Sequence, residues 1–245
     1  MSTNLYVATS GAISRLEQLE ILANNLANVD TTGFKADQAL FEATLEGALI
    51  DGQGRAAPGA PALSFVAPGE VRTDHTGGSV RQTGRPLDVA IEGPGFFVVD
   101  TPGGARFTRA GSFAVSGDKL ATPSGHPVLG DGGTIDTGGG AVRVLGSGDV
   151  VDAQGSVLGK LRVEQFDDPS ALEKDGDTLF RAPPLAVGLP VEGVSLVEGA
   201  LEGSNVNPVR ELASLIMLQR AYDVSMQVLR TDDTATERLL QEVTQ

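Results

Sequence analysis

The stretch from Asn24 to Lys35 has the sequence NNLANVDTTGFK and marks a change in the character of the chain. From Ala12 to Thr32 there is neither glycine nor proline, whereas nearly all of the 32 glycines come later. Asparagine side chains can bond to backbone groups, and Gly33 can adopt the left-handed conformation that ends a helix. The stretch therefore predicts the end of an N-terminal helix. Its asparagines have two open roles, bonding to the backbone there or bridging to a neighbouring subunit.

Upstream of this stretch, apolar and small residues recur in alternating steps of four and three. Such heptad spacing places them on one seam of a helix. Polar side chains such as Glu17 and Glu20 fall off the seam. The pattern predicts a helix from Asn4 to Asn28. Its seam consists of Leu5, Thr9, Ala12, Leu16, Leu19, Ala23 and Leu26.

The other end of the chain has the same character. From Ser204 to Gln245 there is no glycine, and Pro208 is the sole proline. Asn207 suits a helix N-cap, and proline suits the first helical position. These signals predict a helix from Pro208 to Arg230. Its seam consists of Leu212, Leu215, Leu218, Tyr222, Met226 and Leu229.

The terminal position of both helices leaves two arrangements open. They could pack on the middle of the chain as ordinary amphipathic helices, or they could pair with each other or with helices of neighbouring chains. The linkers beside them carry no apolar residues that would hold them to the middle. This favours pairing through the two seams.

The middle of the chain has the signature of β-structure. From Leu87 to Ile91, apolar residues alternate with small or polar ones, which is the period of a half-buried strand. The apolar run from Phe96 to Val99 follows a Gly-Pro-Gly turn, and the segments 142–145 and 157–163 are similar. Glycine-containing turns recur between these candidates. The pattern predicts a sandwich or barrel-like domain of hairpin-connected strands.

The predicted fold class is therefore α+β. We expect N- and C-terminal helices to form a coiled-coil-like core domain from residues 1–46 and 205–245. Residues 47–70 form a connector rich in Gly, Ala and Pro, a composition that favours extended or irregular backbone, and an ordered loop is the alternative. Residues 71–204 form a central, mainly antiparallel β domain.

Charge and composition exclude several classes of protein. The chain has 245 residues with 18 basic and 32 acidic side chains, so its net charge is −14. Such a surface repels nucleic acid and anionic membranes. Without cysteine the chain forms no disulfide. No cleavable signal is expected, because the first cation is Arg15, and no segment approaches the ~18 apolar residues that span a membrane.

No constellation of residues predicts catalysis. His75 and His126 lie far apart in glycine-rich turns, and we expect both to be solvent-exposed loop residues. Gly146-Ser147-Gly148 lacks the third glycine of a dinucleotide-binding loop. The acidic pairs at 167–168 and 175–177 lack the spacing of a calcium loop. We therefore predict no catalytic residue, no cofactor and no metal site, and hence not an enzyme.

The stretch from Asn24 to Lys35 closely resembles the N-terminal signature of the flagellar rod and hook protein family. Similar matches to shared blocks of this family occur at 83–99, 107–113, 125–130 and 199–209, so the resemblance covers nearly the whole chain. The signature residues matched in this way are Asn24, Asn25, Leu26, Ala27, Asn28, Thr32, Gly33, Phe34, Lys35, Asn205, Gln219, Arg220, Ala221 and Tyr222.

Within the family, the chain looks most like the proximal rod proteins. The form of the segment from Arg85 to Ala90 and the short stretch between Phe34 and Val80 carry this likeness. Distal rod proteins are the alternative, although they usually have a longer segment there. The rival from another class is a secreted β-rich binding module with helical tails.

The resemblance implies a structural role. Terminal helices of this family assemble into the tubular core of the flagellar axis, and the β domain faces outward. Family members leave through the type III export apparatus without a cleaved signal, which implies a place in the basal-body rod within the periplasmic space. The implied partners are that apparatus, other rod proteins and further copies, with no nucleic acid and no membrane insertion. The expected assembly interface comprises Leu5, Ala12, Leu16, Leu19, Ala23, Leu26, Leu215, Leu218, Tyr222, Met226 and Leu229.

Overall fold

The computed structural model describes residues 3–40, 42–46, 63–67, 70–184, 186–191, 193 and 195–243. Side chains are outside that description for residues 3–8, 42–46, 63–67, 228–229 and 232–243. Two predicted seam residues, Leu5 and Leu229, fall among these side chains, and most of the expected connector lies outside the described residues.

The chain divides into two compact units, and both are discontinuous in sequence. The first, which we call the helical unit, comprises Met1–Leu26, Asp37–Arg72 and Asn207–Gln245. The second, the β unit, comprises Ala27–Ala36 and Thr73–Val206. Three segments are grouped differently from the sequence-based division. Residues 27–36 and 205–206 belong with the strands, and residues 47–72 belong with the helices.

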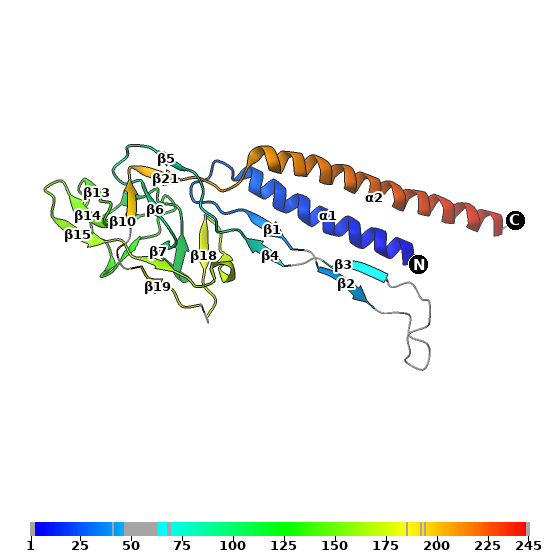
Figure 1. Ribbon diagram of the computed structural model, residues 1–245, viewed down its shortest axis with the longest axis horizontal. Helices are drawn as coiled ribbons and strands as arrows, with labels where there is room; N and C mark the ends of the chain where they lie inside the picture. The colour runs from blue at the N-terminus through cyan, green and yellow to red at the C-terminus, as the bar shows by residue number, and fades with distance from the viewer. Residues whose placement is uncertain are drawn as a thin grey trace. The chain divides into compact units, whose positions relative to one another are not determined.

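The helical unit contains both long helices found in the described residues (Figure 1). Helix α1 runs over Thr3–Ala27 and helix α2 over Pro208–Val243. The predicted N-cap of α2 is confirmed, because Asn207 Oδ1 accepts hydrogen bonds from the backbone N–H groups of Val209 and Arg210, each at 3.1 Å. Helix α2 continues beyond Arg230, where its apolar stripe is interrupted, since no proline or glycine stops it there.

Short strands accompany the helices in this unit. Strand β1 (Asp37–Ala39) pairs with β4 (Val71–Thr73), and β2 (Glu42–Glu46) pairs with β3 (Leu63–Ala67) in antiparallel register. Strand β3 lies within the expected connector, for which extended backbone, irregular backbone and an ordered loop were all left open. Its sequence LSFVA alternates and includes β-branched and aromatic residues, which is the composition of a strand.

The β unit is built from antiparallel strands. A six-stranded sheet has the order β17-β18-β8-β7-β16-β19, and a three-stranded sheet has the order β13-β14-β15. The pairs β20-β6, β21-β5, β10-β9 and β11-β12 complete the unit. The strands are β5 (Val80–Gln82), β6 (Val89–Glu92), β7 (Phe96–Thr101), β8 (Gly104–Thr108), β9 (Ala114–Ser116), β10 (Lys119–Ala121), β11 (Leu129–Gly130), β12 (Gly133–Thr134), β13 (Val142–Val144), β14 (Asp149–Asp152), β15 (Val157–Lys160), β16 (Val163–Gln165), β17 (Glu173–Lys174), β18 (Leu179–Arg181), β19 (Leu189–Pro190), β20 (Ser195–Glu198) and β21 (Ala200–Glu202), with a 3-10 turn at Pro169–Ala171. Two helices with antiparallel strands confirm the α+β class.

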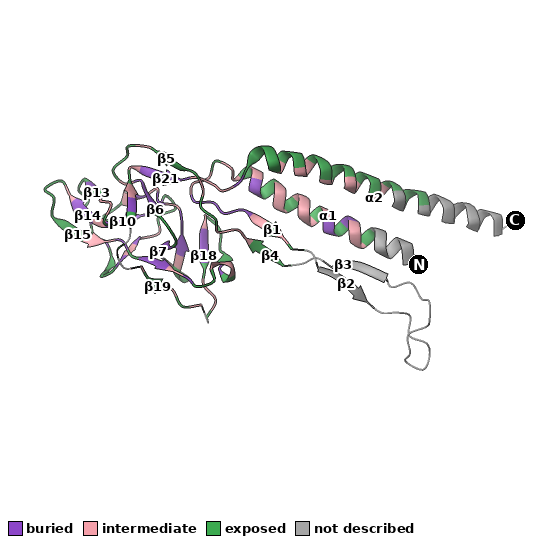
Figure 2. Cartoon of the chain, viewed as in Figure 1, coloured by how far each residue is buried: buried purple, intermediate pink, exposed green. Residues whose placement is uncertain are grey.

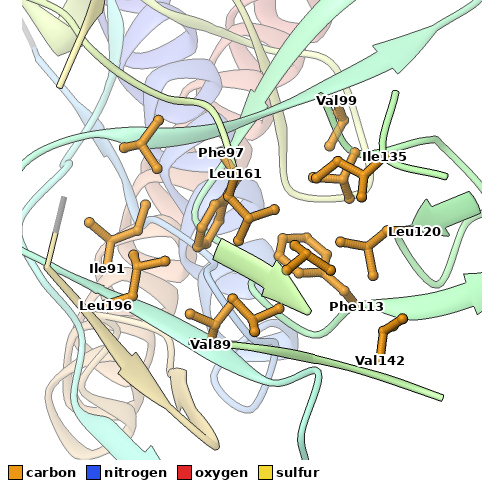
Figure 3. Packing of buried hydrophobic residues seen from close by; sticks show 14 of the residues in the cluster. Val89, Ile91, Phe97, Val99, Phe113, Leu120, Ile135, Val142, Leu161 and Leu196 are labelled. Carbon is orange, nitrogen blue, oxygen red and sulfur yellow. The ribbon is translucent and has the colours of Figure 1, made fainter. Parts of the chain in front are cut away.

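Strand β7 lies between the two apolar clusters of the β unit. Successive side chains of a strand point to opposite faces. Accordingly Phe97 and Val99 pack in one cluster, whereas Phe96 and Val98 pack in the other. Figure 3 shows the first cluster, in which Phe97 meets Phe113 edge to face at 5.1 Å between ring centroids. Each fully buried side chain of this size stabilises the fold by about 1.5–3 kcal/mol.

The two units differ in how deeply their residues are buried (Figure 2). Strands β6 and β7 are buried along most of their length. Among the described side chains of α2, none is buried, and α1 has only Ala12, Ser14 and Asn25 in that class. No helix within the described residues combines the length and the apolarity that crossing a membrane requires.

Candidate functional site

Two signature residues of the β unit, Lys35 and Asn205, meet three further polar residues from chain segments that lie far apart in sequence. Lys35 comes from the segment after α1, Glu202 and Asn205 come from the segment before α2, and Arg109 follows β8. His75 lies in the segment from Thr73 to Gly78, which no sequence pattern singled out. We call Lys35, His75, Arg109, Glu202 and Asn205 the signature cluster.

Gly33 brings the first of these segments into place. Its φ is +69°, and its backbone N–H donates to the carbonyl of Glu202 at 2.8 Å. A Cβ at this position would lie 2.3 Å from the backbone nitrogen of Ala110. The left-handed conformation was predicted, but its expected role in ending the helix is wrong, because α1 already ends at Ala27. Glycine is required here by the close approach of two backbones.

Lys35 and Glu202 form a buried ion pair at the centre of the cluster. Their side chains are 0% and 3% exposed, and Nζ of Lys35 lies 2.6 Å from Oε1 of Glu202. The same ammonium donates to the carbonyl of Thr76 at 2.7 Å. Burial lowers the pKa of Lys35, and the hydrogen bond to Glu202 opposes that shift. A buried charge is tolerated when it is paired and hydrogen-bonded in this way.

Arg109 shares the same carboxylate. Its Nη1 lies 3.4 Å from Oε2 of Glu202, and its Nη2 donates to the carbonyl of Gly93 at 2.8 Å. The guanidinium also lies 5.3 Å from the ring centroid of Phe96. Burial lowers the pKa of Arg109, and the charge of Glu202 opposes this. One buried carboxylate therefore serves two buried cations.

Asn205 ties together three stretches of backbone. Its Oδ1 accepts from the N–H of Ala36 at 2.8 Å, and its Nδ2 donates to the carbonyl of Asp74 at 2.8 Å. The backbone N–H of Asp74 in turn donates to the carbonyl of Ala36 at 2.8 Å. Phe34, Ala36 and Val206 form a small apolar cluster beside these bonds. The segments that continue into α1 and α2 are thereby joined within the β unit.

His75 is packed between aromatic rings, so its expected solvent exposure is wrong. Its ring centroid lies 5.5 Å from that of Phe96 and 5.0 Å from that of Phe180, both edge to face. Within the described part of the chain, neither ring nitrogen has a hydrogen-bond partner. Burial lowers the pKa of His75 to about 4, and the charges of Lys35 and Arg109 add to this. The other histidine, His126, is half-buried.

Asn25 holds the chain inside the helical unit. It is buried, its Nδ2 donates to the carbonyl of Asp37 at 2.9 Å, and its Oδ1 accepts from the N–H of Asp37 at the same distance. The amide thus pairs with the backbone as a neighbouring strand would. Of the two roles left open for the asparagines, Asn25 performs the bonding to backbone. Asn28 accepts a hydrogen bond from Thr31 Oγ1 at 3.1 Å.

The predicted seam of α1 is divided between covered and exposed positions. Ala12 is buried, and Leu19 and Leu26 are half-buried. Leu16 is 46% exposed, and Ala23 is also exposed. The exposed side of α1 continues through Ile13, which the seam did not include and which is 51% exposed.

The C-terminal helix shows a similar division. Four predicted seam residues, Leu215, Leu218, Tyr222 and Met226, are half-buried, as is Ala221 of the signature. Gln219 and Arg220 of the signature are exposed. Among the described side chains of this helix, the large apolar ones that are exposed are Val209, Leu212, Ile216, Met217 and Val224.

A cavity of about 450 Å³ adjoins the signature cluster within the β unit. His75, Arg109 and Glu202 contribute to its lining, together with Val80, Phe96 and Phe166. Over the described residues, no group of three or more His, Cys, Asp or Glu is arranged to hold a metal ion.

Comparison with known protein families decides the identity of the chain. Residues 5–35 match the family model "Flagella basal body rod protein", residues 90–177 match "Flagellar hook protein FlgE/F/G D1 domain", and residues 197–242 match "Flagellar basal body rod FlgEFG protein C-terminal". The chain is similar to the flagellar basal-body rod protein FlgF of Caulobacter vibrioides, with 38% identity over 96% of this chain and 94% of that protein. The chain belongs to the flagellar basal-body rod protein family.

Within the rod protein family, the relatives support the FlgF type. FlgF of Rhizobium meliloti is 31% identical over 98% of both chains. FlgG of Bacillus subtilis is also 31% identical over 98% of both chains, so the two types of rod protein are near relatives of this chain. The family is one of structural rod proteins and is not a class of enzyme.

Arg109 and Glu202 lie in the segments 107–113 and 199–209 that resemble family blocks, and both fall inside the matched regions. Their pairing in one cluster was not predicted. His75 lies between the matched regions 5–35 and 90–177. The sequence did indicate that an acidic partner is needed. Lys35 follows an apolar residue in the signature, and a lysine that is buried there requires a carboxylate. Sequence alone offered no means of choosing among the 32 acidic residues.

Proposed function

We propose that this rod subunit assembles into the flagellar axis through the seams of its two terminal helices. The helices would pack in coiled-coil fashion with helices of other rod proteins and of further copies of this chain. The single observation that carries the proposal is a row of exposed apolar side chains at helical spacing. Ile13 and Leu16 are neighbours on one face of α1, and Leu212 and Ile216 are neighbours on one face of α2.

The exposure of these residues supports a partner outside the chain. Leu16 is 46% exposed, Leu212 is 46% exposed and Ile216 is 49% exposed. Fully burying one such side chain contributes about 1.5–3 kcal/mol. Isolated helices are marginal, and most of their stability comes from the packing of an amphipathic face. Contacts in an assembly supply that packing.

The half-covered seam residues extend the proposed interface. Leu19, Leu26, Leu215, Leu218, Tyr222 and Met226 retain some accessible surface, whereas Ala12 is already buried in the single chain. We therefore place the centre of the interface on the exposed edge of the predicted seam, at Leu16 and Ala23. We include Ile13 in the interface, although it was not part of the predicted seam.

The wider setting is proposed from the family. We propose that the chain lies in the rod of the basal body, within the periplasmic space, and that the type III export apparatus delivers it without a cleaved signal. The relatives named as basal-body rod proteins support the rod itself. The net charge of −14 supports the absence of nucleic-acid and membrane partners.

The test is to replace Leu16 with Asp in cells that lack the native copy. A carboxylate buried without a partner costs several kcal/mol, so we expect motility and rod incorporation to be lost. Because Leu16 is exposed in the single chain, the melting temperature of the purified protein should stay within about 2 °C of the parent's. Incorporation is measured by immunoblotting isolated basal bodies.

Val157 provides the matched control. It is an apolar residue of strand β15 in the β unit and is 63% exposed, so Val157→Asp should assemble normally. Normal assembly of Leu16→Asp would refute the proposed interface. A large drop in the melting temperature of the purified variant would assign Leu16 to the core of the single chain instead.

A further inference from the structure

The segment from Thr73 to Gly78 supplies acceptors to both signature side chains that join the chain ends. Lys35 Nζ donates to the carbonyl of Thr76 at 2.7 Å, and Asn205 Nδ2 donates to the carbonyl of Asp74 at 2.8 Å. The N–H of Gly78 donates to Glu202 Oε1 at 2.9 Å. His75 lies in the middle of this segment. Anything that displaces it removes acceptors from Lys35 and Asn205 together.

The surroundings of His75 favour its neutral form. Its ring meets Phe96 and Phe180 edge to face, and within the described part of the chain no acceptor reaches either ring nitrogen. The charged groups that act on it are the cations Lys35, Arg109 and Lys174 and the carboxylate of Asp74. Glu202 is nearby but already serves Lys35 and Arg109. A proton on His75 would add a further positive charge to a site with no acceptor to receive it.

The cavity beside the cluster gives the segment from Thr73 to Gly78 room to move without disturbing the rest of the β unit. His75, Gly77 and Gly78 all line this space of about 450 Å³. The segment therefore borders open space and is not enclosed on all sides by packed strands. A protonated His75 can leave the aromatic rings when the segment moves, without disruption of the main apolar cluster around Phe97.

We propose that His75 is an acid-sensitive latch, whose protonation releases the segment from Thr73 to Gly78 and so uncouples the two segments that continue into α1 and α2. The released state exposes the ring to water and leaves Lys35 and Asn205 without their backbone acceptors. This regulation goes beyond the proposed assembly role and does not depend on it.

The direction of the pH dependence follows from linkage. The pKa of His75 is about 4 in the folded chain and 6.5 when unperturbed, so the released state binds more protons between these values. Latching is complete above pH 6.5 and weakens as pH falls towards 4. At pH 5 the equilibrium between released and latched states should favour release by roughly thirtyfold more than at pH 7.5.

Hydrogen exchange on the full chain tests the latch. We compare protection factors, corrected for intrinsic exchange rates, at pH 7.5 and pH 5 in residues 29–36, 73–78 and 202–206. The parent protein should lose roughly thirtyfold in protection there, while β7 and β8 stay protected. His75→Phe keeps an aromatic ring that cannot take a proton, so its protection should not change between the two pH values. His126→Phe is the matched control and should behave like the parent.

Two outcomes would overturn the proposal. One is an equal loss of protection in the parent and in His75→Phe, and the other is a loss spread evenly over the β unit. Imidazole resonances of the parent protein give a second measurement that requires no folded His75 variant. The chain has only two histidines, and His126→Phe assigns them. A folded-state titration of His75 near 6.5 would by itself exclude the latch.

Discussion

The signature cluster and the exposed edge of the helices place opposite kinds of residue in opposite surroundings. In the β unit, Lys35, Arg109 and Glu202 are charged and buried. In the helical unit, Leu16 and Ile216 are apolar and exposed. A buried charge needs its partner within the chain, because desolvation without pairing is costly. A row of exposed apolar side chains at helical spacing is instead stabilised when another chain covers it. The first region completes a fold, and the second is suited to an assembly.

The largest effect should come from removing the cluster altogether. A chain of residues 27–206 contains the whole β unit, whereas a chain of residues 73–197 loses Lys35, Glu202 and Asn205 and also strand β21. The shorter chain leaves Arg109 buried without its carboxylate. We expect it to be less stable than the longer chain by at least about 3–5 kcal/mol, or to lack a cooperative transition. Thermal melts followed by circular dichroism measure this. Equal melting temperatures would show that the cluster is not part of the fold.

A single charge within the cluster should have a smaller but still large effect. Glu202→Gln leaves two buried cations without a counter-charge, so we expect a loss of about 3–5 kcal/mol in the free energy of unfolding. Lys35→Met combined with Glu202→Gln should cost less than the sum of the two single changes, because the two side chains are in contact. Urea denaturation of all variants gives the coupling.

Glu92 supplies the control for this charge removal. It is an exposed glutamate in the same unit, and Glu92→Gln should change stability by no more than about 0.5 kcal/mol. A comparable loss in Glu92→Gln and Glu202→Gln would mean that overall charge, and not the buried pair, determines the effect.

The smallest expected effect lies in the helical unit. Asn25→Ala removes the two hydrogen bonds between this side chain and the backbone of Asp37, which should cost about 1–3 kcal/mol locally. The measurement is the protection of the Asp37 amide against hydrogen exchange, which should fall by about tenfold or more. Glu20→Ala on the same helix should leave that amide unchanged. Unchanged protection in Asn25→Ala would show that the Asn25 side chain does not hold the backbone of Asp37 in place.

Local patterns were sufficient for the elements that the sequence predicted well. The N-cap at Asn207 and the proline after it locate the start of α2, because these residues satisfy backbone groups within one turn. The apolar run from Phe96 to Val99 identifies a buried strand for the same local reason. The candidate site was harder to predict from the sequence. Gly33 was expected to end a helix, because its left-handed conformation is local information, whereas the backbone of Ala110 that it approaches is distant in sequence.

Sequence patterns alone established the α+β class, the terminal position of the helices, the rod and hook family and the backbone conformation of Gly33, because periodicity, capping residues and motifs act over short spans of chain. The folded structure was needed to show that residues 27–36 belong with the β unit, that Lys35 meets Glu202, and that His75 is packed between Phe96 and Phe180. It also divided the seam of α1 into covered and exposed halves. These contacts join residues that are separated along the chain, as Lys35 and Glu202 are by 167 positions, or depend on which face of a helix is covered. No local pattern encodes them, since the energy of a buried contact depends on what else is buried beside it.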